Sequence, residues 1–145
     1  MGLSREAIRA RLGRRIMGAG SAAWWTASGA YALVIFALSS QPDPLGVQRL
    51  PPFTDKLIHA LVFGGLSLLV HMAWRRSFPG RPWFWSVIAI TALYGLSDEF
   101  HQSFVPGRSM DAWDLVADTV GACAVQWGLA TRRFASLREA AQRTV

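Results

Sequence analysis

The sequence DEFHQSFVPGRSMDAWDLVAD, residues 98–118, contains five carboxylates, one histidine and one arginine. The chain as a whole is 52% hydrophobic and only 17% charged, so its few ionisable side chains are concentrated in this segment. Apolar runs at residues 83–97 and 115–130 enclose it on both sides. We interpret the segment as a polar connection between two membrane-spanning helices, and this interpretation determines the predicted fold.

Two further apolar runs, residues 16–42 and 57–74, precede this connection. A helix needs about 20 apolar residues to cross a bilayer, and shorter runs are accommodated by snorkelling side chains or local thinning. The four runs therefore predict an all-α fold, an integral membrane four-helix bundle. The first run is long for a signal peptide, which favours a retained span over a cleaved leader. The single cysteine, Cys123, cannot form a disulfide within one chain.

Lysine and arginine lie mostly on one side of the predicted spans. Twelve of them fall in the N-terminal segment, the second connection and the C-terminal tail, against three in the other two connections. Cytoplasmic connections carry the excess of these residues, so both termini are predicted to be cytoplasmic. The chain then divides into a basic N-terminus (1–15), a four-span domain (16–131) and a basic tail (132–145). The net charge of +6 reflects this topology, and no nucleic-acid binding is expected.

The acidic residues have the opposite distribution, because seven of the nine fall on the predicted outer side. Asp55 and His59 are four residues apart and share a helical face, and Asp114 and Asp118 do the same. An acid one turn inside the membrane must face protein or water and needs a partner. We therefore expect a polar cavity at the outer end of the bundle. Its predicted catalytic residues are Asp55, His59, Asp98, Glu99, Asp114 and Asp118, and its predicted substrate-binding residues are Lys56, Tyr94, Gln102 and Arg108.

Two expectations depend on where the last two helices begin and end. Tyr94, Asp98 and Gln102 form a row at i, i+4 and i+8, provided that the third helix continues as far as the last of them. Asp111 suits the N-cap of the fourth helix, in a capping box that Asp114 would close.

Structural roles in helix packing are predicted for other residues. The fourth span is expected to pack closely on Gly64 and Gly65 of the second span, and His71 is interpreted as a packing histidine. The small residues that would permit this close approach are Ala117, Gly121, Ala124 and Gly128.

The chemistry of the predicted cavity stays open. Asp55 and His59 suit an oriented general base, while Lys56 and Arg108 could hold a phosphate or pyrophosphate. Glu99 would be either paired with Arg108 or solvated. No motif has metal-ligand spacing, so no metal ligand is assigned, although Asp and His could bind a divalent cation. The same network could also lock the bundle without any chemistry, so an enzyme is neither predicted nor excluded.

Four motifs in this sequence resemble the VanZ-like family of small bacterial membrane proteins. They are SSQP (39–42), DKLIH (55–59), YGLSDEFHQSFVPGR (94–108) and D-x-x-x-D-x-x-G (114–121). The resemblance covers roughly residues 25–130. The chain departs from the family pattern at Asp118, where many relatives would have Asn, and this second carboxylate changes the charge of the predicted cavity.

The resemblance implies a protein of the bacterial inner membrane with a role in the cell envelope. The naming member of the family is associated with tolerance to the antibiotic teicoplanin, and the resemblance carries no molecular mechanism. We expect the cavity to bind or process a lipid-linked or anionic envelope substrate, with membrane lipids as its surroundings. The alternative is a non-catalytic membrane scaffold or binding module. The sequence does not indicate an oligomeric state.

Overall fold

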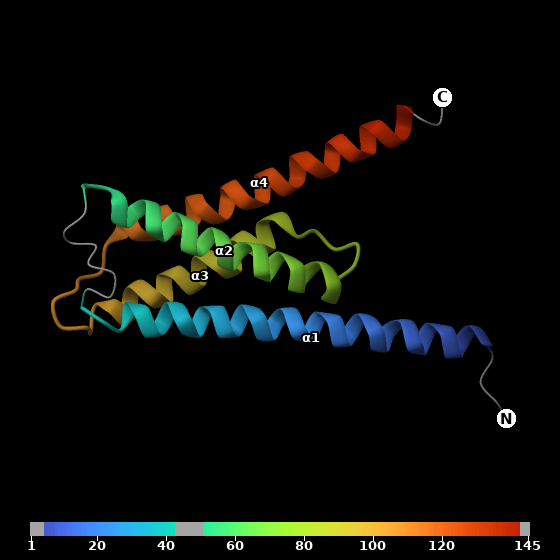
Figure 1. The fold of residues 1–145 in the computed structure, drawn as a ribbon, viewed down its shortest axis with the longest axis horizontal. Helices are drawn as coiled ribbons and strands as arrows, with labels where there is room; N and C mark the ends of the chain where they lie inside the picture. The colour runs from blue at the N-terminus through green and yellow to red at the C-terminus, as the bar shows by residue number, and fades with distance from the viewer. Residues whose placement is uncertain (1–4, 43–50, 143–145) are drawn as a thin grey trace.

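The described residues form four helices and no strands (Figure 1). The computed structural model describes residues 5–42 and 51–142, with side chains over 20–42 and 51–135. The helices are α1 (Arg5–Ser39), α2 (Thr54–Ser77), α3 (Phe84–Gln102) and α4 (Ala112–Gln142). This confirms the all-α prediction. Asp43 and Arg49 of the first connection lie outside the described residues.

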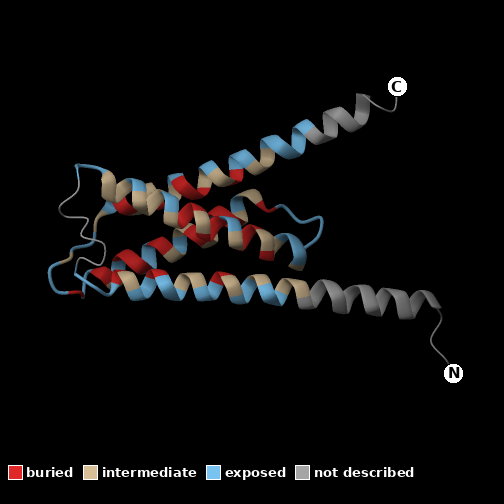
Figure 2. Ribbon diagram, in the orientation of Figure 1, coloured by how far each residue is buried: buried red, intermediate tan, exposed pale blue. Residues whose placement is uncertain are grey.

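Buried residues lie where the helices face one another, and exposed residues lie on their outer faces (Figure 2). The polarity of this arrangement is inverted relative to that of a water-soluble protein. Among the described residues, eleven buried side chains are polar or charged and ten are hydrophobic. Each helix also exposes large apolar side chains, for example Leu33, Leu61, Leu93 and Val120. In water, large apolar surfaces of this kind are normally buried. An apolar exterior around a polar interior is the arrangement expected when lipid is the solvent.

Two helical segments among the described residues are long and apolar enough to cross a membrane, Gly20–Ser39 of α1 and Thr54–Ser77 of α2. The helices α3 and α4 are also predicted to span, but they do not meet the same test of length and mean hydropathy. The reason is that each includes two or more carboxylates within its length, which lowers the mean hydropathy. Length and composition thus select two of the four predicted spans.

The helices α2 and α4 approach each other closely at Gly121. A Cβ atom added to Gly121 would lie 2.0 Å from the carbonyl oxygen of Ala60 in α2. An added Cβ at Gly64, one turn further along α2, would lie 3.4 Å from the carbonyl oxygen of Gly121. The predicted close packing of these two helices is therefore confirmed at Gly64 and Gly121, where a side chain on the α4 glycine would push the helices apart.

Three of the other small residues, Gly65, Ala124 and Gly128, do not lie at the predicted α2–α4 contact. Ala124 is exposed, and an added Cβ at Gly128 would meet no atom within 4 Å. Gly65 faces α1 instead of α4, because a Cβ there would lie 2.8 Å from the hydroxyl oxygen of Tyr31. The contact face of α4 includes Asp118, Gly121 and Val125, which lie against α2, so Ala124 and Gly128 lie beside this face.

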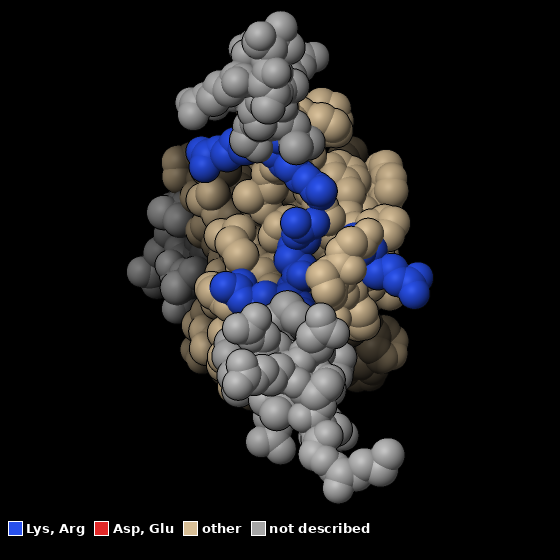
Figure 3. Space-filling view, turned by 90° about the vertical axis from the view of Figure 1, so that its right-hand side faces the viewer, with Lys and Arg blue, Asp and Glu red and all other residues tan. Residues whose placement is uncertain are grey.

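The described acidic side chains lie at one end of the bundle, and most of the described basic side chains lie at the other. The helix α1 begins and α4 ends at one end, together with the α2–α3 connection (Figure 1). Figure 3 views this end and shows Lys and Arg but no Asp or Glu among the residues drawn in colour. The carboxylates whose side chains are described lie toward the other end, where α2 and α4 begin and α3 ends. This separation defines a basic end and an acidic end of the bundle.

Candidate functional site

The start of α4 is held by two hydrogen bonds of Asp111, one to its side chain and one from its backbone N–H. The Asp111 carboxylate accepts the backbone N–H of Trp113 at 2.8 Å, which confirms Asp111 as the N-cap. The backbone N–H of Asp111 donates to Glu99 Oε2 at 2.9 Å. The second half of the capping arrangement therefore comes from α3 and not from Asp114. Glu99 is fully buried against this cap, so it is neither solvated nor paired with Arg108.

Lys56 neutralises three carboxylates that form the rim of the acidic end, namely Asp55, Asp111 and Asp114. Its Nζ lies 2.5 Å from Asp111 Oδ2, 2.7 Å from Asp114 Oδ1 and 3.0 Å from Asp55 Oδ2. An ammonium group has three N–H donors, so the three carboxylates engage all of them. The hydrogen bond from Lys56, supported by that from Trp113, holds the pKa of Asp111 below its ordinary value. Lys56, predicted to bind a substrate phosphate, is thus occupied by the protein itself.

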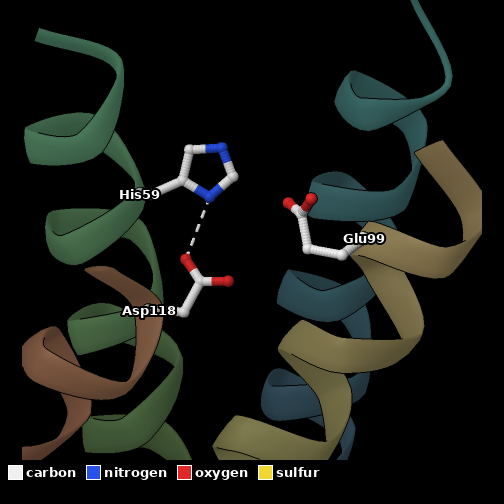
Figure 4. Close-up of side chains that lie close together, drawn as sticks. All are labelled: His59, Glu99 and Asp118. Carbon is white, nitrogen blue, oxygen red and sulfur yellow. Dashed lines mark hydrogen bonds and ion pairs between the residues drawn. The ribbon is translucent and has the colours of Figure 1, made fainter. Parts of the chain in front are cut away.

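His59, Glu99 and Asp118 come from three different helices and lie close together beneath this rim (Figure 4). His59 Nδ1 lies 2.9 Å from Asp118 Oδ1, and its Nε2 lies 3.9 Å from Asp114 Oδ2. The partner of His59 is therefore Asp118 of α4. Asp55, which shares a helical face with His59, has a side chain that is 42% exposed and pairs with the rim lysine instead. Because α4 packs closely on α2, Asp118 is the carboxylate that reaches His59.

Two oxygens in this group have no hydrogen-bond partner among the described residues, Glu99 Oε1 and Asp118 Oδ2. Both residues have 0% exposure. Gly95 of α3 makes room for Asp118, because an added Cβ would lie 2.8 Å from Asp118 Oδ2. A buried carboxylate oxygen without a donor is unfavourable. The group is therefore incomplete as a structural network and has two acceptors available to a proton or a ligand.

A second polar group joins α1 to α3. Asp98 accepts hydrogen bonds from Ser39 Oγ at 2.6 Å and from Gln102 Nε2 at 2.8 Å, and all three residues are buried. The helix α3 continues to Gln102, as the predicted row requires. Tyr94 donates instead to the backbone carbonyl of Ala32 at 2.6 Å, which ties it to α1. Ser39 is absent from the predicted site, although the SSQP motif contains it.

Arg108 and His101 lie at the edge of the acidic end. Arg108 Nη1 donates to the backbone carbonyl of Gln41 at 3.5 Å, a long contact that leaves most of the guanidinium donors for other partners. His101 Nε2 lies 3.0 Å from Ser40 Oγ, and its ring stacks on Phe36 at 4.3 Å between centroids. Arg108 is thus separate from the buried group formed by the α2, α3 and α4 side chains.

A third polar group lies nearer the basic end, between α2 and α4. Gln126 Nε2 donates to Ser67 Oγ at 2.7 Å, and Gln126 Oε1 lies 2.9 Å from His71 Nδ1. His71 also packs edge-on against Trp83. The prediction of a packing histidine agrees with these contacts. Gln126 was missed because a single amide in an apolar run gives no spacing signal, and its burial depends on the position of α2.

These observations define the class of protein: an all-helical bundle with an apolar exterior and a buried acid–histidine group at one end. The chain belongs to the VanZ/LLP1 family, because the model of that family matches residues 14–131. This confirms the resemblance that the sequence motifs indicate. Family membership and the two apolar helices together indicate a membrane protein. No curated protein and no solved structure matches the chain.

Proposed function

We propose that this VanZ-family protein spans the bacterial inner membrane four times, with both termini in the cytoplasm. In this arrangement the acidic end faces outward and binds an anionic, lipid-linked envelope substrate. His59 and its neighbours contact the substrate headgroup, and the apolar exterior contacts the lipid chains. Membership in the VanZ family supports the proposed role in the cell envelope, and the position of the site at one end of the bundle supports the proposed type of substrate.

The charge separation supports this orientation. The described arginines of the α2–α3 connection and of α4 lie toward the basic end, and connections rich in Arg are typically cytoplasmic. Large apolar side chains are exposed on α3 and α4 as well as on α1 and α2. This pattern supports four spans although only two helices are apolar enough by composition alone.

One observation carries the proposed site: the exposed fraction of the side chains falls from the rim to His59 and then to Asp118. The side chain of Asp55 is 42% exposed, that of His59 is 15% exposed, and that of Asp118 is fully buried. His59 therefore connects the buried carboxylates to the surface. A hydrogen bond joins Asp118 Oδ1 to His59 Nδ1. This bond orients the imidazole ring, so that Nε2 faces Asp114. A carboxylate-oriented imidazole suits proton transfer or headgroup binding.

A second candidate function is favoured by Lys56. Its three carboxylate contacts join the first turn of α2 to the start of α4, and such a network can fix packing without binding anything. In this case the protein is a membrane scaffold. The unpartnered oxygens of Glu99 and Asp118 argue against this alternative, because a purely structural network gains nothing from them.

We expect His59→Gln to abolish substrate retention while leaving the fold intact. The protein is purified from its native membrane in detergent, and bound anionic lipids are quantified by mass spectrometry. Loss of one headgroup contact of about 1.4 kcal/mol or more lowers retention at least about tenfold. The unfolding midpoint should stay within a few degrees of that of the unaltered protein.

The matched control is His71→Gln, since His71 lies on the same helix but in the network at the other end. It should retain lipid even if its midpoint falls. Equal lipid retention by the His59 and His71 variants would refute the proposed site. If the amount of bound lipid falls in proportion to the unfolding midpoint in both variants, the result would support the scaffold instead.

A further inference from the structure

We propose that His59, Glu99 and Asp118 bind one divalent transition-metal ion, of which Zn²⁺ is the best match. The three side chains converge from α2, α3 and α4 (Figure 4). Their spacing in the chain, 40 residues and then 19, belongs to no local metal-binding motif. The site is therefore visible only after the helices are assembled.

The geometry is close to that of a metal site. One nitrogen or oxygen from each residue lies within 4.8 Å of the other two. Ligands around zinc lie about 2.0–2.2 Å from the ion, and hence about 3–4 Å from one another in a tetrahedral arrangement. The three atoms are therefore at most about 1–2 Å further apart than zinc ligands are from one another.

The electrostatics of the group point to a cation. Glu99 Oε1 and Asp118 Oδ2 are buried acceptors without a donor among the described residues, and they belong to the two residues that flank His59. Lys56, the cation at the rim, is engaged by three other carboxylates. A divalent ion would neutralise both buried carboxylates at once, which offsets the cost of burying them.

The donor set selects the kind of ion. One imidazole and two carboxylates are typical of zinc and of neighbouring first-row metals, whereas magnesium and calcium prefer oxygen ligands alone. Three protein ligands leave a fourth position on zinc open to a water or to a substrate oxygen. Asp111 N–H fixes the other oxygen of Glu99, as outer partners of metal ligands commonly do.

This ion would also explain how an acidic site accepts an anion. Six carboxylates of the described residues lie at this end of the bundle, and they would repel a phosphate headgroup: Asp55, Asp98, Glu99, Asp111, Asp114 and Asp118. A bound zinc ion with an open position offers the phosphate an attractive contact. This use of the ion rests on the proposed function, whereas binding of the ion itself does not and is measured without any substrate.

The experiment is a zinc titration of the purified, tag-free protein in detergent after treatment with EDTA and desalting. We expect one zinc per chain by calorimetry and elemental analysis. At a hundredfold excess over Kd, the unfolding midpoint should rise by about 5–10 °C. Magnesium at the same concentration should cause a much smaller rise.

The variants Glu99→Gln and Asp118→Asn keep the shape of each side chain and remove its charge, and His59→Gln removes the nitrogen ligand. Each should weaken zinc binding at least about a hundredfold, whereas His71→Gln should bind zinc as the unaltered protein does. Absence of stoichiometric zinc binding would overturn the site, as expected if a water or a shared proton occupies it. Zinc binding by the three ligand variants that is as tight as that of the unaltered protein would overturn the site as well. Zinc binding that persists while anionic lipid is absent would uphold the site and refute only the proposed substrate.

Discussion

Gly121→Ala is expected to unfold the α2–α4 interface or to weaken it severely. The added Cβ would lie 2.0 Å from the carbonyl oxygen of Ala60 and 2.8 Å from its Cα, and both are backbone atoms that cannot rotate away. The helices must therefore separate, and the buried contacts around Asp118 are lost with them. Overpacking of this kind costs about 1–3 kcal/mol or more. Thermal unfolding in detergent measures the loss.

The control for this prediction is Gly128→Ala on the same helix. A Cβ there meets no atom within 4 Å, so only the helix propensity changes. Alanine is favoured over glycine inside a helix by about 0.5–1 kcal/mol, and the midpoint should stay equal or rise slightly. An equal fall of the midpoint in both variants would show that the close contact at Gly121 is not what holds α2 and α4 together.

Lys56→Met should be the most disruptive change at the acidic end. It removes the ammonium group that lies within 3.0 Å of Asp55, Asp111 and Asp114 and leaves three carboxylates to repel one another. Loss of one partner from a buried ion pair costs about 3–5 kcal/mol, and the partial exposure of Lys56 reduces this to about 2–3 kcal/mol. Lys56→Arg keeps the charge and should recover most of the stability. A methionine variant that unfolds at the same midpoint as the unaltered protein would contradict the role of Lys56.

The pH dependence of this contact has a defined sign. Lys56 lowers the pKa of Asp111 in the folded protein, so the contact stabilises the fold fully above the ordinary value of about 4. The stabilisation is lost as the pH falls below that value toward the lowered pKa. The midpoint of the unaltered protein should therefore fall on acidification below about pH 4, and Lys56→Met should show a smaller fall. A larger fall in the variant would contradict the assignment.

Much of the fold follows from local patterns. Runs of apolar residues predict the four helices, and the N-cap at Asp111 follows from a short polar residue before a helix. The row from Asp98 to Gln102 depends only on helical periodicity and is confirmed. These features involve residues a few positions apart, so the chain determines them before any tertiary contact forms.

The partners of the site residues do not follow in the same way. His59 has Asp55 on its own helical face, yet Asp118 is its partner because Gly121 brings α4 against α2. Glu99 is held by the Asp111 backbone, which depends on the path of the α3–α4 connection. Helical periodicity predicts which side chains share a face, but the rotation and separation of neighbouring helices decide which of them meet.

Thiol labelling in intact spheroplasts tests the central claim most directly, namely that the acidic end faces outward across the membrane. In a Cys123→Ala background, single cysteines replace Phe53, which is 80% exposed at the acidic end, or Arg81, which is exposed at the basic end. A membrane-impermeant maleimide should label the cysteine at position 53 at once, and the cysteine at position 81 only after the membrane is permeabilised. Labelling of position 81 from outside, with position 53 protected, would contradict the account.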